Sequence, residues 1–489
     1  MASENSLDSA QTAALLAHDP RFDKRNRLVI AVLMVSTFVV ILNETLMIVA
    51  IPHLMTALGV TAGAAQWLTT AFLLTMSIVI PVTGFLLQRM NTRPVFLLAM
   101  TLFSVGTLMC ALASGLAALV VGRVIQACGT AVMMPLLMTT IMMLVPEQRR
   151  GQFMGNVSVV ISVAPAIGPA AAGFILSQFD WPWLFWLVLP ISLSALAFGY
   201  FRIVNVTVTR YAPVDIPSVA LSGIAFGGIV YGLSSMGQID THNAPIAAWK
   251  ALTIGIFSMV IFIWRQLRLQ KREQALLDLR TFKSHGFSIS LGMMAIAMMT
   301  FFGAIILLPI YMQNVLALST LQTGLIFLPG GLIMGLLAPW VGRLYDRHGP
   351  VRLVVPGALI FSAVLWGMTQ LDTDSSWQFI LLGHLLIGTS LALVFTPLFT
   401  ASMSSIPPPL YSHGSALLGS IQQLAGAAGV ALLIALMSVE SARLTSIGTP
   451  SINALAGGIR NAFLWAALLS LVAVITAFFV RRPVAMHKQ

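Results

Sequence analysis

Apolar stretches alternate with short polar or basic segments along almost the whole chain, from Leu28 to Val480. Many stretches have the length of roughly 20 residues that a helix needs to span a bilayer. Breaking them at charges and turn residues predicts fourteen transmembrane helices and hence an all-α polytopic membrane protein. The predicted helices are 28–50, 66–87, 94–113, 117–144, 151–176, 183–204, 216–236, 247–267, 287–309, 320–342, 352–371, 376–399, 413–438 and 460–480.

The composition excludes a soluble globular protein. Hydrophobic residues make up 58% of the chain and charged residues only 8%, whereas soluble domains carry about 25% charged residues. The two cysteines, Cys110 and Cys128, both lie in apolar stretches, without CxxC spacing or a Cys/His cluster. We therefore expect neither a disulfide framework nor a metal site.

The charge balance predicts the topology. The chain carries a net charge of +11, from 26 Lys and Arg against 15 Asp and Glu. The positive-inside rule explains this excess without nucleic acid as a partner. With a cytoplasmic N-terminus, 22 of the 26 basic residues fall in cytoplasmic segments, and only Lys250, Arg443 and Arg460 fall outside. We expect both termini in the cytoplasm.

An internal repeat relates the two halves of the chain. Segments 81–89 and 339–347 share proline, glycine and arginine at the same spacing, offset by 258 residues. This offset predicts two six-helix halves with two inserted helices, and paired halves with a site near the midplane are a transporter architecture. The expected divisions are tails at 1–27 and 481–489, bundles at 28–204 and 286–480, and an insertion at 205–285.

The repeated turns resemble a signature of the major facilitator superfamily, G-x-L-x-D-R-x-G-R. Segment 342–349 reads GRLYDRHG and keeps nearly all of it, whereas the first copy has Gln88 at the aspartate position. Segment 123–126 (RVIQ) resembles the R-x-x-Q/G motif of the same superfamily, and segment 164–173 (APAIGPAAAG) resembles a motif associated with its antiporters. Three further segments resemble the fourteen-span drug:proton antiporters of the superfamily: 42–53 (LNETLMIVAIPH), 181–186 (WPWLFW) and 308–313 (LPIYMQ).

This resemblance implies a fold and a function. Segment 42–53 is similar to the L-N-x-T form of lincomycin-resistance-type pumps, with Asn43 at the usual aspartate position. The protein would export lipophilic or cationic drugs in exchange for protons, with the proton as the coupling ion and no cofactor. It would act as a monomer in a bacterial cytoplasmic membrane. The expected cavity residues are Asn43, Gln126, Met134 and Gln313; clustered methionines would suit an adaptable cavity, or else lipid-facing and core positions.

Ionisable residues inside the predicted helices are the candidate coupling site. Glu44 is the only acidic residue well inside a span, and Arg123 is the only basic one. At about 1.5 Å per residue, these two and His384 share one level in the outer half of the bilayer. Such residues are costly and mark a functional site by default. A carboxyl that is alternately dry and wet, or near and far from Arg123, takes up and releases a proton.

Each of these assignments has an alternative. Glu44 would otherwise form a structural ion pair or occupy a solvated position, and Arg123 would serve fixed helix packing. His384 would be a neutral histidine bonded to a neighbouring helix.

Two further sets of residues, a helix hinge and a latch between helices, are predicted to take part in conformational change. Glycine and proline bend membrane helices and let them approach closely, so we expect a hinge in 151–176. The hinge residues are Pro165, Gly168, Pro169 and Gly173. We expect the basic turns to form a cytoplasmic latch between helices, with ordinary solvated charge as the alternative. The latch residues are Gly84, Arg89, Gly342, Asp346 and Arg347.

The chain contains no GxxxxGK[ST], HExxH or GxSxG motif, which argues against an enzyme or an ATP-driven pump. The leading hypothesis is a proton-coupled antiporter that exports drugs by alternating access. A proton symporter or a dedicated metabolite or peptide exporter of the same fold is the alternative. A channel is a third class, and it would conduct without coupled proton movement.

Overall fold

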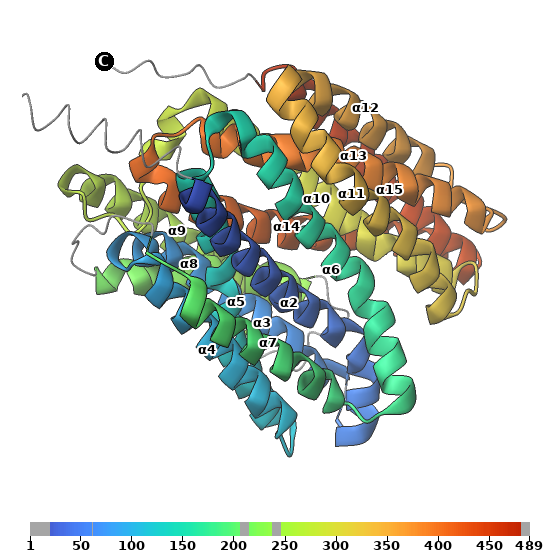
Figure 1. The fold of residues 1–489 in the computed structure, drawn as a ribbon. Helices are drawn as coiled ribbons and strands as arrows, with labels where there is room; N and C mark the ends of the chain where they lie inside the picture. The colour runs from blue at the N-terminus through green and yellow to red at the C-terminus, as the bar shows by residue number, and fades with distance from the viewer. Residues whose placement is uncertain (1–19, 61, 206–214, 237–245, 481–489) are drawn as a thin grey trace, which may run out of the picture.

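The structure, a computed structural model, describes residues 20–60, 62–205, 215–236 and 246–480. Within these residues, 14 helices are long and apolar enough to cross a membrane, and no strand is assigned. The predicted all-α class and the predicted number of spans are therefore confirmed. The helices run alternately up and down through one elongated bundle (Figure 1).

The first six helices form one group. They are α2 (Pro20–Leu58), α3 (Ala62–Arg89), α4 (Thr92–Ala111), α5 (Leu116–Leu144), α6 (Arg150–Gln178) and α7 (Trp183–Arg202). The next two are α8 (Ile216–Met236) and α9 (Ala248–Leu269). The last six are α10 (His285–Asn314), α11 (Thr320–His348), α12 (Val351–Met368), α13 (Trp377–Ser404), α14 (Tyr411–Ser446) and α15 (Ser451–Ala477). Short 3-10 turns occur at η1 (Glu147–Arg149), η2 (Gln270–Arg272), η3 (Leu279–Lys283) and η4 (Pro408–Leu410).

Several helices are longer than the predicted spans. Helix α2 continues to Leu58 rather than ending near residue 50, and α15 begins at Ser451 rather than near residue 460. Apolarity marks only the part of a helix inside the hydrocarbon, while backbone hydrogen bonding continues into the polar interface. Arg460 consequently lies within α15, where its Nε donates to the carbonyl oxygen of Thr369 at 3.2 Å.

Helices α8 and α9 pack closely against each other, and α8 also contacts α3 of the first group and α14 of the last. The close approach depends on glycine. A Cβ added at Gly228 would lie 2.9 Å from the Cα of Gly255 and 3.0 Å from the carbonyl oxygen of Ala251. Small residues at helix contacts are the usual means of close packing in membranes.

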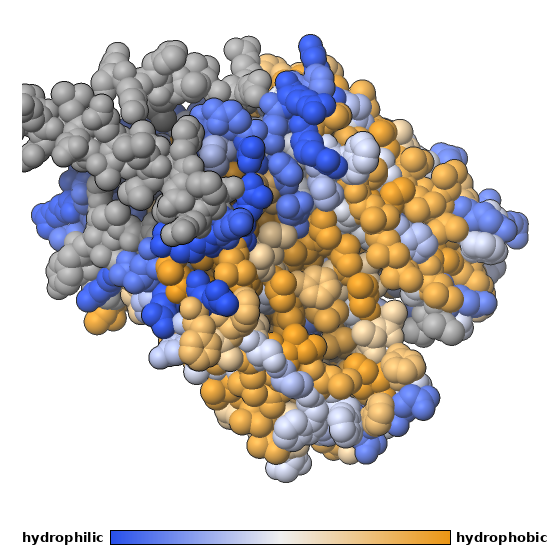
Figure 2. Space-filling model, in the orientation of Figure 1, coloured by the Kyte–Doolittle hydropathy of each residue, from blue (hydrophilic) through white to orange (hydrophobic). Residues whose placement is uncertain are grey.

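We call the end of the bundle at which α2 begins and α15 ends the basic face, and the other end the opposite face. The first and last six-helix groups meet toward the basic face and diverge toward the opposite face (Figure 1). A broad hydrophobic surface covers the middle of the molecule, and hydrophilic residues gather toward its ends (Figure 2). This surface is what a protein solvated by lipid tails requires.

Candidate functional site

The candidate coupling site lies between α2 and α5. Glu44 on α2 is half-buried, and Arg123 on α5 is almost fully buried, at 1% exposure. The two side chains are close enough for their charges to interact. Among the described residues no direct ion pair joins them. The structure thus brings together the two ionisable residues that the sequence singles out.

A chain of polar contacts holds Arg123 in place. Its Nη1 donates to Oε1 of Gln126 at 2.6 Å, and the guanidinium lies 3.9 Å from the ring centroid of Phe72 on α3. Nε2 of Gln126 in turn donates to Oγ1 of Thr107 on α4 at 2.7 Å. Charge-assisted hydrogen bonds and cation–π contacts strengthen when water is excluded. Arg123 is therefore a fixed cation that three helices orient.

This arrangement changes the expected role of Gln126. The residue is expected in a substrate cavity, yet its side chain is fully buried and both ends of its amide are used in hydrogen bonds. A buried amide that satisfies Arg123 orients the cation rather than contacting a substrate in this conformation.

The position of Glu44 along α2 differs from the one that the apolar stretch predicts. Because α2 continues to Leu58, Glu44 lies 14 residues, or about 21 Å, from that end. The adjacent Thr45 nevertheless contacts Gly168 of α6. Segment 164–173, which resembles the antiporter motif, thus touches the helix that carries Glu44.

Gly168 permits this contact because it lacks a side chain. A Cβ at Gly168 would collide with Oγ1 and Cβ of Thr45, whereas one at Gly173 would meet nothing within 4 Å. Pro165 and Pro169 lie inside α6 on either side of this contact. The predicted hinge therefore includes one tightly packed glycine and one glycine in open space.

These two glycines give a matched prediction. Gly168→Ala should impair efflux and lower thermal stability, because over-packing typically costs about 1–3 kcal/mol. Gly173→Ala should leave both nearly unchanged. Adding Thr45→Ser to Gly168→Ala should restore part of the stability, since the Cγ2 methyl group is removed and the side chain can turn. Efflux assays and thermal unfolding of the purified variants test this, and equal effects of the two glycine variants would contradict it.

His384 lies in the other six-helix group. It is 7% exposed, its ring centroid is 4.4 Å from that of Phe327 on α11, and it packs against Gly330. Its Nδ1 is buried without a hydrogen-bond partner among the described residues. The structure does not bring His384 together with Glu44 and Arg123.

The remaining cavity candidates occupy different environments. Asn43 is buried at 1% exposure, and its Nδ2 has no partner within the described part of the chain. Met134 on α5 is half-buried. Gln313 is exposed and lies one residue before the end of α10. It therefore belongs to the last six-helix group, whereas Asn43, Gln126 and Met134 belong to the first.

At the basic face, the second repeat copy bridges the two groups. Oδ1 of Asp346 accepts from the backbone N–H of Gly151 at 2.8 Å, and Oδ2 accepts from that of Gln152 at 2.9 Å. These N–H groups belong to the first turn of α6, where the helix dipole favours a negative charge. Gly342 packs directly against the backbone of Gly151. The exposed Arg347 takes no part in these two bonds.

The first repeat copy makes the pseudo-equivalent contact. Gly84 of α3 packs against His413 and Ser412 of α14, and Nε2 of Gln88 donates to the carbonyl oxygen of Pro409 at 3.1 Å. Arg89 is exposed. Each copy therefore joins a helix end of one group to a helix start of the other.

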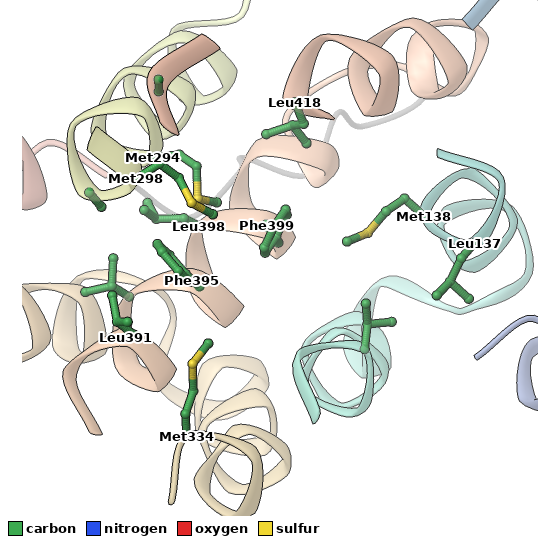
Figure 3. Close-up of a cluster of buried hydrophobic side chains, with 14 of the residues drawn as sticks. Leu137, Met138, Met294, Met298, Met334, Leu391, Phe395, Leu398, Phe399 and Leu418 are labelled. Atoms are coloured by element: carbon green, nitrogen blue, oxygen red, sulfur yellow. The ribbon is translucent and has the colours of Figure 1, made fainter. Parts of the chain in front are cut away.

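Residues that sequence reasoning missed complete the closure at the basic face. Two hydroxyl pairs cross between the groups: Thr139 with Ser415 at 3.0 Å, and Thr396 with Ser158 at 2.8 Å. Figure 3 shows Met138 of α5 pointing toward Phe399 of α13. Both apolar side chains are buried. Scattered hydroxyl and apolar residues give no signal until the fold places them opposite one another.

Comparison with known proteins identifies the class. The sequence model of the Major Facilitator Superfamily matches residues 33–430. The chain belongs to this superfamily, and it is a multi-pass membrane transporter rather than an enzyme.

Relatives of the chain include bacterial proteins with drug-resistance names, besides others named only as uncharacterised transporters of the superfamily. The chain is 36% identical to "Lincomycin resistance protein LmrB" of Listeria monocytogenes, over 93% of this chain and 96% of that protein. It is 34% identical to the LmrB of Bacillus subtilis, over 93% and 96% of the two chains. "Probable multidrug resistance protein EmrY" of Escherichia coli is 28% identical, over 83% of this chain and 78% of that one.

Solved structures share the fold. The human organic anion transporter MFSD10 (TETRAN) matches with a TM-score of 0.65 at 17% identity, over 92% of this chain and 99% of that one. The proton:xylose symporter XylE matches with a TM-score of 0.61 at 15% identity, over 92% and 96%. At these identities the likeness shows a major facilitator fold.

Proposed function

We propose that the protein is an antiporter that exports lipophilic or cationic drugs across the cytoplasmic membrane while protons flow inward. The observation that carries this proposal is Glu44, a carboxyl on an apolar helix long enough to span a membrane, within electrostatic range of the fixed cation Arg123. The drug-resistance names of relatives that match over nearly the full chain support the substrate class.

The site has the parts that coupling requires. A carboxylate near a cation favours the charged form, and loss of water favours the protonated form. Movement that changes the distance from Glu44 to Arg123, or its access to water, alters its proton affinity. Thr45 packs on Gly168 of α6, and α6 also packs on α11 of the other group, so a movement between the groups would act on the helix that contacts the Glu44-bearing helix α2.

Proton release driven by drug addition tests the proposal. Inside-out vesicles that contain the protein and hold an acidic interior should lose protons when lincomycin or a cationic dye is added outside. Vesicles without the protein should not. Proton uptake into the vesicles in the direction of the drug would indicate a symporter. Drug movement that ignores the proton gradient would favour a channel.

The proposed orientation places the basic face in the cytoplasm. A cysteine introduced at position 485 should resist a membrane-impermeant maleimide applied to intact cells. One at Asp374, which is exposed in the turn between α12 and α13 on the opposite face, should react. Cell lysis should make both react, and labelling of position 485 in intact cells would reverse the topology.

A further inference from the structure

An open groove lies at the turn between α6 and α7, at the opposite face of the first six-helix group (Figure 1). Its volume is about 320 Å³, and it is lined by Asp180, Pro182, Trp183 and Trp186. Ligand pockets have volumes of about 300–1,000 Å³. The groove is formed by the α6–α7 turn, whereas the candidate coupling site lies between α2 and α5.

The lining of the groove includes one carboxylate and, among the described residues, no basic side chain. Asp180 is exposed, and it takes part in none of the salt bridges within the described chain. The positive-inside pattern places three basic residues at this face, Lys250, Arg443 and Arg460, and each of them has a contact elsewhere. The carboxylate of Asp180 can therefore receive a cation from outside the protein.

Two indole rings form the aromatic wall of the groove. Trp183 and Trp186 are 44% and 38% exposed, and the ring centroid of Phe179 lies 5.1 Å from that of Trp183. The same side of α7 continues with the exposed side chains of Leu187 and Ile191. Tryptophan rings favour the membrane–water interface and attract cations over their faces. The groove thus combines a carboxylate and two aromatic rings with an apolar helix side that leads toward the lipid tails.

We propose that this groove binds the headgroup of an aminophospholipid. The ammonium group would donate hydrogen bonds to the carboxylate of Asp180 and lie against the rings of Trp183 and Trp186. The acyl chains would follow the exposed side of α7 into the bilayer. Hydrogen bonds between oppositely charged groups are stronger than those between neutral groups, and the lipid phosphate remains in contact with water. In the orientation proposed above, the lipid belongs to the outer leaflet.

The lining favours this occupant over an anionic lipid or the transported drug. A phosphatidylglycerol headgroup offers no cation to Asp180, and the carboxylate repels its negative charge. A drug that crosses by alternating access passes between the two six-helix groups, whereas α7 packs on α2 and α4 of its own group. An aminophospholipid reaches the groove from the bilayer and matches both its charged and its apolar parts.

Lipid retention by the purified full-length protein tests the proposal, independently of orientation and of transport. Native mass spectrometry would compare bound phosphatidylethanolamine with phosphatidylglycerol of identical acyl chains. An exposed ion pair and a cation–π contact each contribute up to roughly a fivefold gain in binding, so Asp180→Asn with Trp183→Leu and Trp186→Leu should lower phosphatidylethanolamine retention about tenfold. Asp180→Asn alone should remove most of the preference over phosphatidylglycerol, and Asp180→Glu should keep it.

Two matched variants separate this site from general attraction at the same face. Asp374→Asn removes the same charge from the turn between α12 and α13, and Trp377→Leu removes an exposed tryptophan at the start of α13. Both should leave retention unchanged. Equal loss in either control, or an unchanged lipid preference in Asp180→Asn, would overturn the proposal. Displacement of the lipid by a micromolar lipophilic dye cation would assign the groove to the drug and would overturn it as well.

Discussion

Glu44→Gln is expected to reduce proton-driven, uphill efflux to the background of vesicles without the protein. Glutamine keeps the size and hydrogen-bonding capacity of glutamate but cannot titrate. The variant should fold and bind substrate, and downhill drug exchange should survive because the rocking movement itself requires no titratable group. Efflux and proton release, measured from the same vesicles across a range of pH, separate these steps.

Two variants sharpen this test. Glu44→Asp should keep partial activity with a displaced pH optimum, because the shorter carboxyl still titrates at a different distance from Arg123. Glu440→Gln is the matched control on α14, where Glu440 forms an exposed ion pair with Arg443 at 2.6 Å; exposed pairs contribute only about 0–1 kcal/mol. Full proton-coupled efflux by Glu44→Gln would exclude the carrier role and direct attention to His384.

The helix pattern and the residue pair at the site could be predicted from sequence for physical reasons. A bilayer admits only long apolar helices here, so the number of spans follows from hydropathy. A lone acid and a lone base inside such helices stand out because their burial is expensive. Glu44 and Arg123 were identified by rarity, and the structure places them within interaction range.

Other parts of the site depend on tertiary contacts that leave no trace in sequence. Thr107 accepts a hydrogen bond from Gln126 of another helix. Its sequence gives no sign of this contact, because a threonine in an apolar helix usually bonds to the backbone of its own helix. His413, buried against Gly84, lies at the first polar turn of α14, where a histidine attracts no notice. For Gln126, the sequence motif predicts a residue of the substrate cavity. Its hydrogen bonds instead show a buried amide that orients Arg123.

The repeated segments 81–89 and 339–347 show which part of an interhelix contact can be predicted from sequence. The offset between segments 81–89 and 339–347 predicted two related helix ends, and both contact the other six-helix group at the basic face. The partners could not be predicted, because they are ordinary backbone groups. Pro409 offers a carbonyl oxygen, and Gly151 and Gln152 offer N–H groups.

Asp346→Asn is expected to weaken this closure and lower efflux about tenfold or more. Hydrogen bonds to a charged group contribute about 1.5–3 kcal/mol each, and about 1.4 kcal/mol corresponds to a tenfold change in an equilibrium. Asparagine retains one acceptor oxygen for Gly151 or Gln152, but not both bonds and not the charge that suits the start of α6. The conformation in which the two groups are in contact at the basic face should therefore be less populated in this variant.

A cysteine at Thr139 reports this change directly. Thr139 pairs with Ser415 across the two groups and is 1% exposed, so a thiol there reacts only when the basic face opens. With Cys110 and Cys128 replaced by alanine, Asp346→Asn should speed its labelling in inside-out vesicles. Gln88→Asn shortens the side chain that donates to Pro409 and changes no charge, so it should accelerate the labelling less. If Asp346→Asn alters neither labelling nor efflux, the carboxylate is ordinary solvated charge, and closure rests on the glycine contacts and the layer of Met138 and Phe399.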